Sequence, residues 1–94
     1  MEETISLYAA IAEMRYITSQ GGFFAFMHAT YNREKHITNG IREVKRAKLR
    51  PAANGDDIAN ADYKLFYHDD IFREDRNCWQ MLIMYFNGKK VVLS

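Results

Sequence analysis

The chain has 94 residues, which is the length of one small domain and leaves no room for a catalytic domain plus a regulatory one. Apolar residues make up 48% of it and charged residues 27%, a composition that excludes a disordered, collagen-like or disulfide-stapled protein. The 13 Lys and Arg against 12 Asp and Glu give a net charge of +1, which argues against a strongly basic nucleic-acid module and against an acidic mimic.

The N-terminal part of the chain predicts one helix over residues 6–20. Apolar side chains recur there at the i, i+3, i+4, i+7 spacing that lines one side of an α-helix. Ser6 is placed to cap the first turn, and Gly21 and Gly22 supply the positive φ at which helices commonly end. The apolar residues with this spacing are Leu7, Ala10, Ile11, Met14 and Ile17.

After the two glycines the apolar periodicity is nearer two, which predicts strands. Polar stretches rich in Asn, Gly and Asp, at 32–40, 52–61 and 69–77, are expected to be loops and turns. Asn87 and Gly88 are expected to form the two-residue type I′ turn of a hairpin. The predicted strands cover residues 23–32, 41–50, 62–68, 78–86 and 89–93.

The short connections favour antiparallel pairing, because parallel neighbours need a crossover of about a dozen residues or more. The sequence therefore predicts a single α+β domain over residues 1–94, with an N-terminal helix followed by a five-stranded antiparallel meander. Strong strand twist allows such a sheet to curl into a small, partly open barrel, with the helix over one face or one end.

The predicted strand over 41–50 carries a row of basic residues. In a regular strand Arg42, Arg46, Lys48 and Arg50 share one side, with neighbours on that side about 6.6 to 6.8 Å apart. Such a row can follow the phosphates of a nucleic acid or another polyanion. The alternative is a solvated face that keeps a strand edge from aggregating, with acidic residues on a paired strand neutralising it.

The residue types that carry catalysis or metal binding do not form a recognisable pattern. His28, His36 and His68 stand apart, and the only thiol, Cys78, falls in a predicted buried strand where it would be unreactive. A thiol or histidine enzyme would need Cys78, His28 and His68 within hydrogen-bond reach of one another. We expect no metal, no cofactor and no enzymatic activity.

Aromatic side chains are abundant, with six Phe, six Tyr and one Trp. The predicted strands over 23–32 and 78–86 are apolar on both sides, so both sides must be covered. The helix can cover one side, and a barrel interior, a second layer or a partner subunit must cover the other. The residues expected at such an interface are Phe24, Phe26, Trp79, Met81, Ile83 and Tyr85.

The location of the protein is indicated by its ends and its cysteine content. A single cysteine cannot form an internal disulfide, which suits a reducing compartment. The chain opens with Met-Glu-Glu where a secretory signal would carry basic residues, and no run approaches the roughly 18 apolar residues of a membrane span. We expect a soluble, cytoplasmic protein that does not enter a membrane.

Together these patterns predict a non-enzymatic structural or protein-interaction module that works as a homo-oligomer or as a component of a larger assembly. The alternative is a nucleic-acid-binding module that uses the basic strand.

Three segments carry a resemblance to known sequences: ISLYAAIAEMR, TYNREKHITNGIREVKRAKLRPA and MYFNGKKVVL. They resemble a group of short, uncharacterised bacterial proteins encoded in prophage and conjugative-element regions, over nearly the whole chain. The resemblance implies an accessory or structural piece of a mobile element that depends on partners, and it implies no active site.

Overall fold

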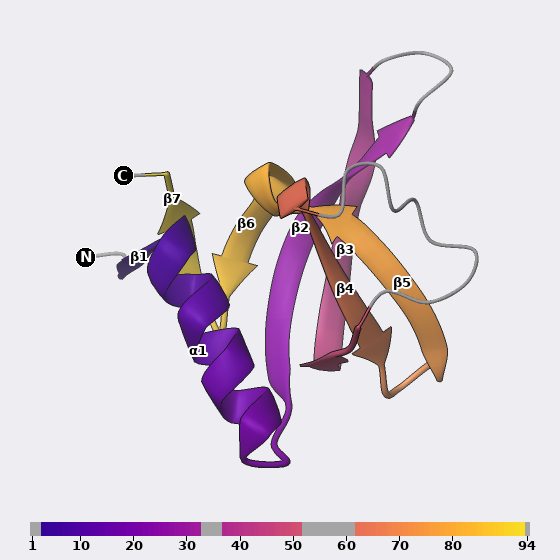
Figure 1. Cartoon of the computed structure of the whole chain (residues 1–94). Coiled ribbons are helices and arrows are strands. Elements are labelled where there is room, and N and C mark those ends of the chain that lie inside the picture. The colour runs from indigo at the N-terminus through magenta and orange to yellow at the C-terminus, as the bar shows by residue number, and fades with distance from the viewer. Residues whose placement is uncertain (1–2, 33–36, 52–61, 94) are drawn as a thin grey trace.

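The computed structural model describes residues 3–32, 37–51 and 62–93. The predicted α+β class is confirmed, with a helix near the N-terminus and a mostly antiparallel sheet (Figure 1). The described elements are β1 (Thr4–Ser6), α1 (Leu7–Ser19), β2 (Phe24–Asn32), β3 (Ile37–Leu49), β4 (Lys64–Asp69), β5 (Glu74–Trp79), the short 3-10 helix η2 (Gln80–Leu82), β6 (Ile83–Phe86) and β7 (Lys89–Val92).

Helix α1 begins and ends where its capping residues predict. The side-chain oxygen of Ser6 accepts a hydrogen bond from the backbone N–H of Ala9 (3.1 Å), which satisfies one free donor of the first turn. At the other end Gly21 has φ +76°, and the N–H of Gly22 donates to the carbonyl of Ile17 (2.9 Å). The apolar side of the helix is buried through Ala10, Ile11 and Met14.

The described strands form one seven-stranded open sheet in the order β1-β7-β6-β2-β3-β4-β5. The β1–β7 pair is parallel and the other pairs are antiparallel. The expected five-stranded meander is therefore wrong, and the sheet, which the sequence allows to curl into a partly open barrel, stays open. After β5 the chain passes through η2 and places β6 beside β2, so β1 and β5 are left as the two edges of the sheet (Figure 1).

Several element boundaries differ from those predicted. The apolar run 78–86 is one strand by periodicity, but η2 divides it between β5 and β6. Residues 74–77, expected in a turn, belong to β5, because the turn after β4 is tight. The buried carboxylate of Asp69 accepts hydrogen bonds from the N–H groups of Ile71 (3.0 Å) and Phe72 (3.2 Å), which closes that turn within a few residues.

Strand β3 contains two irregularities that its sequence does not predict. Near its start, Gly40 has φ +109° at a register shift, so the strand begins at Ile37 and not at residue 41. Further on, Phe26 pairs with Val44 while Phe24 pairs with Ala47, so β3 carries one extra residue there. Val44 and Ala47 are consequently both buried, and the residues beyond the bulge point to the opposite faces from those that regular alternation predicts.

The core lies between α1 and the inner face of the curved sheet. The rings of Phe24, Phe26 and Phe86 pack at centroid distances of 5.6 and 5.9 Å, and Tyr67 stands edge-on to Phe26 at 5.0 Å. At the other end of the sheet, Asn87 (φ 47°) and Gly88 (φ 83°) form the predicted tight turn between β6 and β7. Within the described part of the chain, no helix combines the length and apolar character needed to cross a membrane.

Candidate functional site

A polar pocket lies between two pairs of strands, β2–β3 and β4–β5. The pairs are joined by the β3–β4 ladder, in which residues 47–49 pair with residues 67–69. The pocket has a volume of about 270 Å³. We call it the cationic pocket, and it is lined by His28, Ala29, Thr30, Arg42, Lys64, Tyr67, Arg76, Asn77, Cys78 and Trp79.

Three cationic residues from three strands line this pocket. Arg42 comes from β3, Lys64 from β4 and Arg76 from β5, and none of the described residues that line the pocket is acidic. Lys64 is only 8% exposed, and its Nζ lies 4.9 Å from the centre of the Trp79 ring. The face of an aromatic ring attracts a cation, so Trp79 is one partner of this buried ammonium group.

His28 lies at the floor of the pocket and is 4% exposed. Its Nδ1 lies 3.1 Å from the carbonyl oxygen of Ala29, which can only accept, so Nδ1 carries the proton of the neutral ring. Its Nε2 then accepts a hydrogen bond from the hydroxyl of Tyr67 (3.0 Å). Burial lowers the pKa of His28, the hydrogen bond to the Ala29 carbonyl raises it in part, and the charges of Arg42 and Arg76 lower it further.

Arg76 carries a donor that has no acceptor in the described part of the chain. Its Nη2 forms an ion pair with Glu74, whereas its buried Nε has no hydrogen-bond partner among the described residues. A buried N–H without an acceptor costs free energy, and a ligand oxygen would recover that cost. Glu74 thus compensates the charge of Arg76 from outside the lining, and the pocket offers a ligand the Arg76 Nε–H, which has no acceptor among the described residues.

The predicted basic row is divided between the two faces of the sheet. Because of the extra residue between Val44 and Ala47, Arg42 shares the inner face with His28, while the other three lie on the outer face. The expectation that all four share one side is therefore wrong. The three outer residues are Arg46, Lys48 and Arg50.

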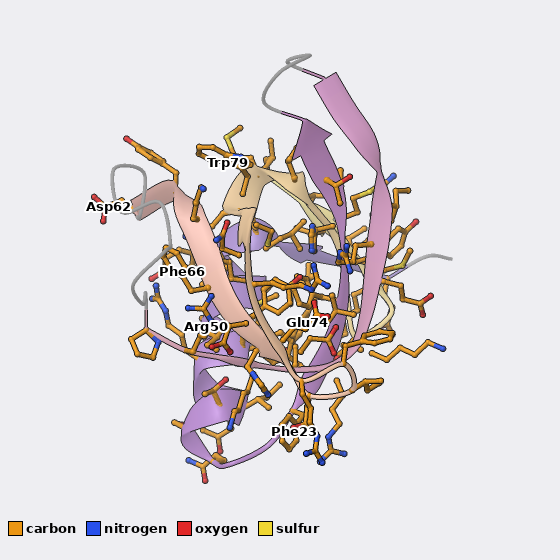
Figure 2. All side chains as sticks on the ribbon, turned by 90° about the vertical axis from the view of Figure 1, so that its right-hand side faces the viewer. Phe23, Arg50, Asp62, Phe66, Glu74 and Trp79 are labelled. Atoms are coloured by element: carbon orange, nitrogen blue, oxygen red, sulfur yellow. The ribbon has the colours of Figure 1, made fainter. Side chains whose placement is uncertain are left out.

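Acidic side chains partner the outer basic residues. Arg46 forms an ion pair with Asp70 (2.8 Å) and stacks on Phe23 at 3.9 Å, and Arg50 Nε lies 3.7 Å from Asp75. Arg50 also lies over the ring of Phe66, beside it in Figure 2. Two of the three outer basic residues thus have an acidic neighbour, as the solvated-face alternative expects, whereas the Arg50 side chain is only 12% exposed.

The residues expected at an interface are also divided. Phe24, Phe26 and Ile83 are 2%, 2% and 5% exposed in the core of the chain itself, so they offer no surface to a partner. β6 lies beside β2, and α1 covers the inner face, which is why these side chains are sealed without a second subunit. Met81 is 70% exposed, and Trp79 and Tyr85 are half-buried.

The thiol and the histidines do not form a catalytic group among the described residues. His68 lies on the outer face, where its Nδ1 contacts Asp75 (2.8 Å), whereas Cys78 and His28 line the cationic pocket. Burial raises the pKa of Cys78 to about 12, so the sulfur is a neutral thiol near pH 7. No cluster of three or more His, Cys, Asp or Glu capable of holding a metal occurs in the ranges that the structure describes. His36 lies outside those ranges.

Sequence reasoning found Arg42 but missed the other key residues of the pocket, Lys64, Tyr67 and Arg76. Lys64 and Tyr67 look like ordinary members of a strand, and residue 76 falls in a stretch expected to be a turn. No local pattern marks these residues, because they meet Arg42 only when β4 and β5 fold over β2 and β3. No protein-family model, curated protein or solved structure matches this chain, so its function has to be inferred from the pocket itself.

Proposed function

We propose that the protein is a non-enzymatic module that binds a small phosphate- or carboxylate-bearing anion in the cationic pocket. The observation that carries this proposal is that Arg42, Lys64 and Arg76 line one pocket whose described lining contains no acid. Guanidinium groups present N–H donors in a planar fork that matches the oxygens of phosphate and carboxylate. The free Nε of Arg76 and the Arg42 side chain supply such donors.

The energetics of the pocket also favour an anion. Arg76 is paired with Glu74, but Arg42 and Lys64 line the same cavity, and partial burial weakens the screening of their mutual repulsion by water. An anion relieves this repulsion in the folded state only, so it stabilises the native protein by mass action. His28, Tyr67 and Cys78, which are kept neutral by burial, add no negative charge that would compete with the ligand.

The test is the binding of inorganic phosphate to the wild type and to two charge-removing variants at constant ionic strength. Arg42→Gln removes a pocket cation, and Arg46→Gln removes an outer-face cation on the same strand. We expect phosphate to raise the Tm of the wild type and Arg42→Gln to weaken its binding about tenfold or more, since hydrogen bonds to charged groups contribute about 1.5 to 3 kcal/mol. Arg46→Gln should bind phosphate as the wild type does. Equal losses in both variants, or no stabilisation of the wild type, would contradict the proposal.

The functions expected from the sequence stay predictions. Nucleic-acid binding would now rest on Arg46, Lys48 and Arg50, and acids partner two of these three. Self-association or docking into a larger assembly would now rest on Met81, Trp79 and Tyr85. Sedimentation of the wild type at high concentration tests self-association, and a strict monomer would argue against it.

A further inference from the structure

A second, apolar hollow opens beside the cationic pocket. It has a volume of about 440 Å³ and is lined by Tyr63, Trp79, Met81 and Leu82, which we call the apolar shelf. Tyr63 is 66% exposed and Met81 70% exposed. Tyr63 directly precedes β4, and η2 begins immediately after Trp79, so the ends of the paired strands β4 and β5 bring the four side chains together. Large apolar side chains gathered in one exposed hollow mark a binding surface more often than isolated ones do.

The shelf and the cationic pocket share a boundary. Trp79 lines both hollows, and in Figure 2 it marks one end of β5. Lys64 pairs with Trp79 across the β4–β5 ladder, and its ammonium group lies 4.9 Å from the centre of the indole ring. A charged group of the pocket and an aromatic ring of the shelf are thus in contact, so the two hollows adjoin at Lys64 and Trp79.

We infer that the anion bound by this protein is amphipathic: its anionic group occupies the cationic pocket, and an aromatic body attached to it lies on the apolar shelf. This inference rests on the proposed function and adds the chemical class of the ligand. An aromatic body suits the shelf, because rings of Trp and Tyr and the sulfur of Met all interact favourably with aromatic rings. The charged residues fix the orientation of the anionic group, and the shelf selects the body.

The experiment compares two phosphate monoesters that share one anionic group, methyl phosphate and phenyl phosphate, with phenol as a neutral probe. We expect phenyl phosphate to bind the wild type about fivefold to tenfold more tightly than methyl phosphate, because a favourable aromatic pair contributes about 0.5 to 1.5 kcal/mol. Trp79 is the only tryptophan, so phenyl phosphate should change the intrinsic fluorescence more than methyl phosphate does.

Two variants of exposed apolar residues distinguish binding to the apolar shelf from non-specific binding to any exposed apolar side chain. Met81→Ala removes part of the shelf, and Phe72→Ala removes a side chain of similar exposure, 66%, from the turn between β4 and β5. We expect Met81→Ala to reduce the preference for phenyl phosphate at least twofold and leave methyl phosphate binding unchanged, and Phe72→Ala to change neither.

The outcomes distinguish the two proposals. Equal affinity of the wild type for both esters would overturn the inference about the aromatic body and leave anion binding intact. Phenol binding as tightly as phenyl phosphate would also overturn it, because the two hollows would then act separately. Absence of binding by either ester would overturn both proposals. The wild-type comparison decides these points even if a variant fails to fold.

Discussion

The ionisable groups at the floor of the pocket are kept neutral by burial. Burial lowers the pKa of His28 and raises the pKa values of Tyr67 and Cys78, so near pH 7 none of the three carries a charge. The electrostatic character of the pocket is therefore set by Arg42, Lys64 and Arg76 alone among its lining residues. This division of roles between neutral and charged side chains gives two predictions at the residue scale.

The first prediction concerns the dependence of stability on pH. The folded-state pKa of His28 lies below its ordinary value of 6.5, so the unfolded chain takes up a proton at a higher pH than the native protein does. The stability that His28 contributes is therefore complete above that value and is lost as the pH falls below it. His28→Gln should lose less free energy of unfolding than the wild type between a neutral and a mildly acidic pH, measured by urea denaturation in an anion-poor buffer. An identical loss in both proteins would contradict this expectation.

The second prediction concerns the reactivity of Cys78. A buried thiol whose pKa is raised to about 12 contains almost no thiolate near pH 8, and its sulfur is shielded from reagents. Ellman's reagent should therefore react slowly with the native protein and rapidly once denaturant unfolds it. Fast stoichiometric reaction of the native chain would show that the β5 edge opens readily or that the thiol is activated.

At the scale of elements, the sequence predicts well the helix and the hairpin that are defined by residues close together in the chain. Helix α1 follows from its apolar spacing, Ser6 and the two glycines, and the β6–β7 hairpin follows from Asn87 and Gly88. These signals act between neighbours in sequence, so they do not depend on the rest of the fold.

One prediction tests how much the N-terminal cap of α1 contributes to the stability of the protein. Ser6→Ala removes the acceptor for the N–H of Ala9 and should lower the free energy of unfolding by about 1 kcal/mol. Ser19→Ala, near the exposed helix end, is the matched control and should change stability by less than about 0.5 kcal/mol. Urea denaturation of the three proteins measures both values. Equal effects of the two substitutions would mean that the cap does not stabilise α1.

The elements that sequence reasoning missed depend on contacts between distant segments. β1 is a three-residue strand that exists because Thr4–Ser6 meets β7 in parallel. The bulge in β3 inserts a residue between Val44 and Ala47, which lets both face the core although their spacing fits no regular strand. The same bulge sends Arg42 into the pocket and Arg46 to the outer face, so the site could not be assembled from the alternation of basic residues.

At the scale of the whole molecule, the open sheet predicts an uneven distribution of local stability. β2 is hydrogen-bonded on one side to β3 and on the other to β6, and its buried side chains lie at the centre of the core. β1 and β5 are edges, and β1 is held through three residue pairs. Local opening is easiest where few contacts have to break.

Amide hydrogen exchange measures this distribution. We expect the amides of β2 that are hydrogen-bonded to β3 or β6 to exchange most slowly, because their exchange requires much of the sheet to open. The amides of β1 should exchange orders of magnitude faster. Protection in β1 equal to that in β2 would mean that the parallel edge pair is integral to the core. Protection that rises in β4 and β5 on addition of phosphate would additionally place the anion between the two pairs of strands.

The short ladder between β3 and β4 has a consequence for how the pocket can change over time and between variants. The β2–β3 pair and the β4–β5 pair are connected by the β3–β4 ladder, in which residues 47–49 pair with residues 67–69. Because this ladder connects the two pairs of strands, the angle between the pairs contributes to the width of the pocket. We expect a larger side chain at the buried Ala47 to change that angle, and with it the size of ligand admitted, without altering a charged group.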